Sequence, residues 1–257
     1  MDEYPANRLR LGLIGAGNIA CVIADNADVY EIVCVHDIVE ERARDFANKY
    51  GCSVTEVHNF PKLDLVVEAA SQEAVRQYAE DILRRKQSLM VMSVGAFVDI
   101  KLFGRLKRLA AENGVRLVLP SGAIAGLDGI KSAGVGEIQE VVLTTTKPPK
   151  GLGLEVNECT IVFEGPSSEA VRKFPKNVNI AATLSLAGIG FERTRVRIIA
   201  DPGATSNQHE IYVRGEFGEL SAKVKNVPSP QNPRTSYLAA MSAVSAIRRF
   251  RDPVVIG

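Results

Sequence analysis

The sequence is short of the residues that mark several common classes of protein. It has no tryptophan, only three histidines and only four cysteines, and these cysteines stand singly as Cys21, Cys34, Cys52 and Cys159. Because no two of them form a C-x-x-C pair, neither a zinc site nor a disulfide framework is expected. We therefore expect no bound metal, and we interpret Cys21 and Cys34 as small core residues.

An excess of charge of one sign and long apolar runs are also lacking. Lysine and arginine number 31 and aspartate and glutamate 30, which argues against a general binder of nucleic acids or membrane surfaces. No apolar run reaches the roughly 20 residues of a transmembrane helix, and the opening MDEYPANRLR has no apolar region of the signal-peptide kind. A cytoplasmic protein without membrane or nucleic-acid partners is expected, and 257 residues are enough for two modest domains.

The stretch LRLGLIGAGNIA, residues 9–20, predicts a strand, a tight turn and the start of a helix. It carries the dinucleotide-binding pattern G-x-G-x-x-G/A as Gly15, Gly17 and Ala20. Gly15 permits the turn, and Gly17 lets the backbone approach a pyrophosphate. Asn18 and Ile19 then begin the helix, whose N–H groups attract phosphates.

A second strand over residues 31–35 ends at His36 and Asp37. Asp37 follows Gly17 by 37 − 17 = 20 residues, the spacing of the acidic residue that binds the ribose 2′-hydroxyl of NAD. NAD is therefore the expected cofactor. NADP stays open as the alternative, because a protonated His36 could tolerate a 2′-phosphate.

Strands and helices alternate over roughly the first 120 residues. Buried strands are expected at residues 63–70, 89–94 and 115–119, and helices at residues 39–50, after Ser71, and at 97–113. This order predicts a Rossmann-type, doubly wound parallel sheet. Ala70 and Ser71 follow a strand at the edge where such sheets bind nucleotides, and their small side chains let a ligand come close.

The pattern changes after Pro120. From Ile138 the strands come at closer spacing, and Thr194, Val196 and Ile198 interleave with three arginines, which predicts a sheet with one covered and one polar face. We therefore expect a smaller α+β domain with a mixed sheet over residues 121–232. Its broad sheet face needs cover, which a homodimer contact would supply. Further strands are expected at residues 208–217 and 219–227, helices at 168–174 and 178–187, and a last helix at 235–250.

Few side chains of the second domain suit proton transfer. His209, its only histidine, follows a polar loop and begins a strand; its usual pKa of about 6.5 suits a proton shuttle, although the spacing alone favours a surface histidine. Asn179 lies at a helix start, where an asparagine serves either as a cap or as a ligand contact. Ala123 belongs to a small-residue run that is either a hinge or a contact with a ligand.

Several segments resemble the L-aspartate dehydrogenase family. They are LPSGAIAGLD from Leu119, FPKNVNIAA from Phe174, ADPG from Ala200, NQHE from Asn207 and NPRTS from Asn232. The resemblance implies NAD(P)-dependent oxidative deamination of L-aspartate through iminoaspartate, which can feed NAD biosynthesis. It places the catalytic histidine at His209 and nucleotide contacts at Ala123 and Asn179. It also implies a homodimer and a C-terminal helix that returns to the nucleotide domain, which then comprises residues 1–120 and 233–257.

Two other functions stay open on the residues alone. One is a reductase of another small dicarboxylate or imine, similar to dihydrodipicolinate reductase; the other is a non-catalytic NAD(H)-binding regulatory protein, because fold does not fix function. Aspartate as substrate needs donors for two carboxylates. The sequence offers Lys131, Lys147, Ser121 and Thr183 without ranking them.

Overall fold

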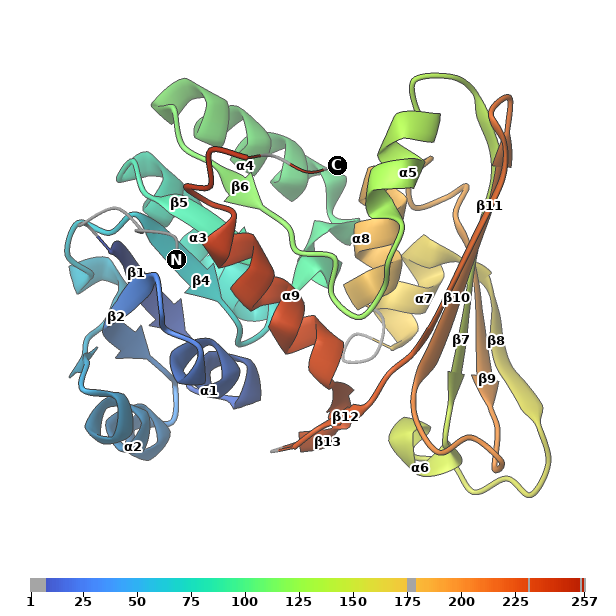
Figure 1. Ribbon diagram of the computed structural model, residues 1–257, viewed down its shortest axis with the longest axis horizontal. Helices are drawn as coiled ribbons and strands as arrows, with labels where there is room; N and C mark the ends of the chain where they lie inside the picture. Colours follow the sequence, from blue (N-terminus) through green and yellow to red (C-terminus); the bar gives the residue numbers. More distant parts are fainter. Residues whose placement is uncertain (1–7, 175–178, 231, 255, 257) are drawn as a thin grey trace. The chain divides into compact units, whose positions relative to one another are not determined.

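The computed structural model describes residues 8–174, 179–230, 232–254 and 256 (Figure 1). The chain divides into two compact units: residues 1–120 with 243–254, and residues 121–242 with 255–257. The sequence placed the return to the first unit at residue 233. In the structure, the N–H of Tyr237 donates to the carbonyl of Val227 (2.9 Å) and that of Gly122 to Oγ of Ser242 (3.1 Å), so residues up to 242 bond within the second unit.

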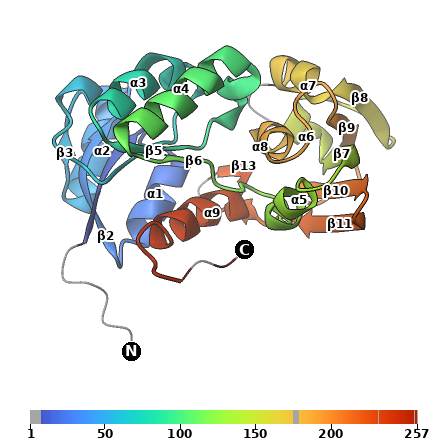
Figure 2. The same cartoon turned by 90° about the horizontal axis from the view of Figure 1, so that it is seen from above.

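The first unit is built on a six-stranded sheet of order β3-β2-β1-β4-β5-β6, in which all neighbours are parallel. This is the doubly wound order expected from the sequence. Figure 2 shows α3 and α4 on one face of the sheet and α1 on the other. The strands are β1 (Leu9–Ile14), β2 (Tyr30–His36), β3 (Ser53–Val54), β4 (Leu65–Glu68), β5 (Ser88–Val91) and β6 (Leu117–Val118). The helices are α1 (Asn18–Asp25), α2 (Glu40–Tyr50), α3 (Gln72–Arg84) and α4 (Ile100–Asn113), with 3-10 turns at Val57–Asn59 and Val94–Val98.

Local signals explain most helix ends of this unit. Gly51, at φ +72°, ends α2, and the Oγ of Ser71 accepts the N–H of Ala74 (3.2 Å) at the start of α3, both as predicted. The single helix predicted for residues 97–113 is wrong at its start. A 3-10 turn comes first, and α4 begins only where Asp99 caps it by accepting the N–H groups of Lys101 and Leu102 (both 3.0 Å).

Residues 248–251 bind to the earlier part of this first unit. Arg248, at the end of α9 (Tyr237–Arg248), pairs with Asp28 (2.8 Å), and Arg251 pairs with Asp64 (2.6 Å). Arg116 also donates to the carbonyl of Phe250 (3.2 Å). Segments about 190–220 residues apart in the sequence therefore close this unit.

The second unit is built on a mixed sheet, as the sequence predicted, and the structure shows its strand order to be β11-β10-β7-β9-β8. The pair β7–β9 is parallel and the other pairs are antiparallel. Helices α5, α7 and α8 lie on one face of this sheet (Figure 1). The strands are β7 (Ile138–Lys147), β8 (Thr160–Pro166), β9 (Arg195–Ala200), β10 (Gln208–Gly215) and β11 (Gly218–Lys225), with a small pair β12 (Pro228–Ser229) and β13 (Asn232–Ser236). The helices are α5 (Leu127–Ala133), α6 (Pro149–Leu152), α7 (Ser167–Lys173) and α8 (Asn179–Ala187).

The two faces of this sheet differ as the alternation predicted. Thr194, Val196 and Ile198 are buried, and so are alternate residues of β7 from Val141 to Lys147. The opposite face carries ion pairs, which are Arg197–Glu164 (2.8 Å), Lys223–Glu210 (3.0 Å) and Arg214–Glu140 (3.5 Å). The helix start predicted at Val178 lies outside the described residues, and α8 begins at Asn179 in the structure.

Candidate active site

The carboxyl edge of the first sheet holds the predicted glycine turn. Gly15 has φ +97°, and a Cβ there would lie 2.8 Å from the carbonyl oxygen of Ala69, so the turn accepts only glycine. A Cβ on Gly17 would meet nothing within 4 Å, and Gly17 gives α1 no side-chain cap. Asn18 and Ile19 form the first turn of α1. A backbone left open in front of a helix start fits the pyrophosphate of a dinucleotide.

Asp37 stands beside this turn. Its carboxylate accepts the N–H of Ala16 (2.8 Å) and that of Val39 (2.9 Å), and Nη1 of Arg42 lies 3.5 Å away. The side chain is only 6% exposed, so Asp37 holds the glycine turn in place and has a cation at its side. His36 is buried, with Nδ1 3.4 Å from Oε2 of Glu56, so it is not poised as a free surface imidazole.

Ala70 and Ser71 reach the same edge from the end of β4. The N–H of Ala69 donates to the carbonyl of Ile14 (2.8 Å), which places this loop against the glycine turn. The next two N–H groups, of Ala70 and Ser71, both donate to Oε1 of Glu68 at 2.8 Å. The structure thus brings the seven predicted nucleotide residues of this unit to one sheet edge: Gly15, Gly17, Asn18, Ile19, Asp37, Ala70 and Ser71.

His209 lies in the second unit near the start of β10. It is 3% exposed and pairs in register with Thr145 of β7, whose Oγ1 lies 3.1 Å from its Nδ1. The surface position that spacing favoured is therefore wrong. Lys147, two residues further along β7 and on the same covered face, is 5% exposed.

Burial changes the protonation of both side chains. It lowers the pKa of His209 to about 3, with the positive charge of Lys147 acting in the same direction. It also lowers the pKa of Lys147, to about 8. The near-neutral pKa expected for His209 is thus wrong for the protein without ligands, because a desolvated imidazole beside a cation loses its proton easily. At neutral pH the pair is a neutral base beside a cation.

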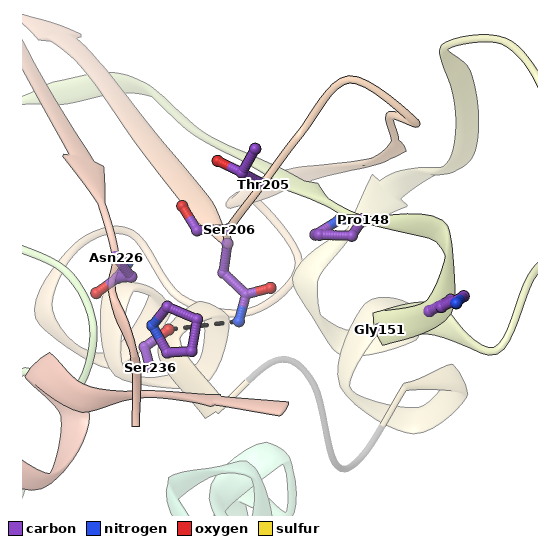
Figure 3. Close-up of a pocket in the computed structure, with 9 residues that line it drawn as sticks. Pro148, Gly151, Thr205, Ser206, Asn226 and Ser236 are labelled. Atoms are coloured by element: carbon purple, nitrogen blue, oxygen red, sulfur yellow. Dashed lines mark hydrogen bonds between the residues drawn. The ribbon is translucent and has the colours of Figure 1, made fainter. Parts of the chain in front are cut away.

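A polar cavity of about 340 Å³ lies within the second unit. Figure 3 shows Pro148 and Gly151 on one side, Asn226 and Ser236 on the other, and Thr205 and Ser206 between them. It opens where β7 ends, β10 begins and β11 ends: Pro148 directly follows Lys147, and Asn207 precedes His209 by two positions. Lys150 is its charged lining residue.

Asn226 is a lining residue that no sequence pattern indicated. It is 3% exposed, its N–H donates to the carbonyl of Asn207 (2.9 Å), and its Nδ2 donates to the carbonyl of Ala123 (3.3 Å). Its Oδ1 is buried and has no hydrogen-bond partner among the described residues. Asn226 therefore fastens the segment that contains Ala123 to the end of β11.

The other predicted residues of this unit lie on different elements. A Cβ on Gly122 would lie 3.3 Å from Cγ2 of Ile180, so Ala123 and Asn179 belong to neighbouring segments. Thr183 is buried on α8 and donates to the carbonyl of Asn179 (3.2 Å). Lys131 is exposed on α5 and Ser121 is half-buried, whereas Lys147 stands beside His209.

Comparisons with known proteins identify the family. Residues 128–250 match the family model "Aspartate dehydrogenase, C-terminal", and residues 11–120 match "Homoserine dehydrogenase, NAD binding domain". An L-aspartate dehydrogenase of Methanosarcina barkeri is 48% identical to this chain, over 97% of the chain and 99% of the relative. The chain belongs to the L-aspartate dehydrogenase family.

A solved structure of the family has the same fold. The crystal structure of the aspartate dehydrogenase of Thermotoga maritima aligns with a TM-score of 0.83 at 30% identity, covering 98% of this chain and 100% of that one. Another family member, from Methanothermobacter thermautotrophicus, is 42% identical over 97% of this chain and 98% of its own length. The resemblance predicted from the sequence motifs is therefore confirmed, and this chain is an oxidoreductase with an NAD-binding domain.

The described residues lack two further features. No helix in that part of the chain is long and apolar enough to cross a membrane. No group of three or more histidine, cysteine, aspartate or glutamate side chains was found there in an arrangement that could hold a metal ion.

Proposed function

We propose that this protein catalyses the NAD(P)-dependent oxidative deamination of L-aspartate. The reaction converts L-aspartate to iminoaspartate, and addition of water then gives oxaloacetate and ammonia. The observation that carries the proposal is the burial of a neutral imidazole, His209, beside a cation, Lys147, in a member of this family. Bound NAD(P) supplies the hydride acceptor for the hydrogen that leaves Cα.

His209 is the proposed base. Its neutral imidazole accepts a proton from the substrate ammonium before the hydride leaves Cα, and it then orients the water that attacks the imine carbon. A pKa of about 3 makes a weak base in the free protein. Burial and, to a smaller extent, the positive charge of Lys147 lower this pKa. A substrate carboxylate close to Lys147 offsets the second of these effects, so binding of the anionic substrate strengthens the base.

Lys147 and the polar cavity are the proposed substrate site. A cavity of about 340 Å³ suits a small metabolite, and its lining of hydroxyl and amide groups with Lys150 suits a dicarboxylate. We assign one carboxylate to Lys147, because burial strengthens its attraction to an anion. The polar loop of Thr205, Ser206 and Asn207 offers donors for the other.

The cofactor contacts follow the sequence prediction. Gly15, Gly17, Asn18 and Ile19 are assigned to the pyrophosphate, Asp37 to the adenosine ribose, and the loop of Ala70 and Ser71 to the neighbouring part of the nucleotide. Ala123 and Asn179 are assigned by the family resemblance. NAD is the expected cofactor, and Arg42 beside Asp37 supports NADP as the alternative.

The setting of the enzyme is also a proposal. We infer a homodimer formed through the charged face of the second sheet. This face carries charges of both signs, so it can pair with the same face of a second copy. We also infer a cytoplasmic location from the four free cysteines, and a supply of iminoaspartate to NAD biosynthesis. A sedimentation experiment at micromolar protein that finds only a 27.8 kDa species would contradict the dimer.

Formation of NADH from L-aspartate, followed by absorbance, tests the function. We expect turnover with L-aspartate and little with D-aspartate, L-glutamate or L-alanine. Reduction of dihydrodipicolinate in place of aspartate oxidation would support the alternative function, a reductase similar to dihydrodipicolinate reductase. Binding of NADH without turnover of any amino acid would indicate a regulatory protein.

A further inference from the structure

Glu68 is a charged residue at the end of an otherwise apolar strand. It closes β4, whose other residues are Leu65, Val66 and Val67, and it is 1% exposed. Burying a carboxylate in such a place is costly unless hydrogen bonds replace the lost water. Burial does raise the pKa of Glu68 above its usual range, against the opposing effect of its hydrogen bonds.

Four hydrogen bonds converge on this carboxylate. Oε1 accepts the N–H groups of Ala70 and Ser71, each at 2.8 Å, and the hydroxyl of Ser93 at 2.9 Å. Oε2 accepts the N–H of Ser93 at 3.0 Å. The donors come from the loops that follow two neighbouring strands, β4 and β5. A single side chain thus ties together two adjacent loops at the carboxyl edge of the sheet.

The loop that Glu68 holds lies against the glycine turn. A Cβ on Gly15 would be 2.8 Å from the carbonyl oxygen of Ala69 and 3.0 Å from Cβ of Ala70. The position of this loop therefore sets how much space the backbone has at Gly15. The two residues whose N–H groups bind Glu68, Ala70 and Ser71, are themselves assigned to the nucleotide.

We propose that Glu68 is a positioning residue for the dinucleotide: its carboxylate fixes the Ala69–Ser71 loop and Ser93 so that the edge beside Gly15 is shaped for the cofactor before the cofactor binds. The proposal rests on the function proposed above. Glu68 acts through this loop and does not itself contact the cofactor. Its carboxylate supplies pre-organisation, because an ordered loop loses less conformational freedom when a ligand binds.

The test replaces Glu68 by Gln, which keeps the shape but puts an amide N–H₂ where one oxygen accepts. In either orientation of this amide a donor then faces a donor: the N–H of Ser93 at the Oε2 position, or the N–H groups of Ala70 and Ser71 at the Oε1 position. The tie between the two loops is therefore weakened. We expect the dissociation constant for NADH, measured by fluorescence titration, to rise about 5- to 30-fold, with kcat at saturating cofactor changed less than about threefold. Ser93→Ala removes one bond, and its effect should be smaller.

Val66→Ala is the matched control, because it weakens the same strand without touching the loop. At a comparable loss of thermal stability it should leave NADH affinity unchanged. Equal weakening of NADH binding by Val66→Ala would show a general loss of stability and overturn the positioning role, as would wild-type affinity in Glu68→Gln. If Glu68→Gln does not fold, Ser93→Ala decides: unchanged NADH affinity there overturns the proposal. Failure of the unaltered protein to bind NADH would instead refute the proposed function.

Discussion

The hydroxyl of Thr145 lies 3.1 Å from Nδ1 of His209, and both side chains are buried on the covered face of the second sheet. A base that works through Nε2 needs its proton on Nδ1. The Thr145 hydroxyl can accept that Nδ1–H, and so favours the tautomer in which Nε2 is free to take a proton.

Thr145→Val should therefore lower activity without emptying space, because valine has the same shape. The Nδ1–H would lose its partner, and kcat/KM for L-aspartate should fall about 5- to 30-fold, the equivalent of about 1–2 kcal/mol. Thr145→Ser keeps the hydroxyl and should restore most of the activity. Thr146→Val, the same change on the other face of β7, is the control. Equal rates for the valine and serine variants would refute the role of the hydroxyl.

His209→Ala should remove the base. General acid–base catalysis is typically worth about 10²–10⁴-fold, so kcat/KM should fall by a factor in that range. NADH affinity should stay nearly unchanged, because the dinucleotide turn lies in the other unit. His58, exposed in a 3-10 turn, is the control, and His58→Ala should be neutral. Retention of more than about a tenth of wild-type turnover would move the base elsewhere.

Lys147 should give the enzyme an alkaline limit. With its pKa lowered to about 8, Lys147 loses its charge above that pH, so kcat/KM for L-aspartate should fall there through a rise in KM. Lys147→Met should raise KM at neutral pH by about 10- to 100-fold and remove this limit from the pH profile. An unchanged alkaline limb in the methionine variant would assign it to another group.

The same shift predicts a dependence of stability on pH. The folded-state pKa of Lys147, about 8, lies below its ordinary value of 10.5, so between these values the unfolded chain binds the proton that the folded chain has released. The Lys147 contribution to the free energy of unfolding is therefore fully present above pH 10.5, and it declines as the pH falls to 8. Urea titrations at several pH values in this window give the free energy of unfolding of the wild type and of Lys147→Met. This free energy should rise more steeply with pH in the wild type, and an equal dependence on pH would show that Lys147 keeps its ordinary pKa in the fold.

Asp37 and Arg42 should together decide the cofactor. The carboxylate accepts from a 2′-hydroxyl and repels a 2′-phosphate, so the unaltered protein should prefer NAD, and Asp37→Ser should narrow that preference by about 1–3 kcal/mol. With the carboxylate gone, Arg42 is free to bind the phosphate. Adding Arg42→Gln to Asp37→Ser should therefore cancel the gain in NADP affinity. Equal affinities of the wild type for both cofactors would contradict the role of Asp37.

Most elements of the first unit could be predicted from the sequence, because the patterns that determine them span only a few residues. A glycine pair, an apolar run and a capping residue each act within a few residues, so the glycine turn, Asp37 and the Ser71 cap stand where they were predicted. The strand β3 was not predicted, because its two exposed residues, Ser53 and Val54, carry no alternation. Glu68 did leave a signal: it was the one charge near the end of an apolar run.

The burial and the neighbours of His209 could not be predicted in the same way. Its pKa depends on burial and on Lys147, which is 209 − 147 = 62 residues away in the sequence and meets it only through the pairing of β7 with β10. Asn226 likewise gains its position from β11 and from the carbonyl of Ala123, 103 residues away. Such contacts are made by the order of strands in a sheet, which local patterns do not encode.

The attachment of Arg248 and Arg251 to the first unit sets an order for synthesis. Asp28 and Asp64 precede the second unit in the sequence, whereas their partners follow it, so both ion pairs form only after residues 121–242 have been made. The intervening 242 − 120 = 122 residues take on the order of ten seconds to translate. The second unit is nearly continuous in the sequence. It is therefore expected to finish folding before Arg248 and Arg251 have been added to the nucleotide-binding unit.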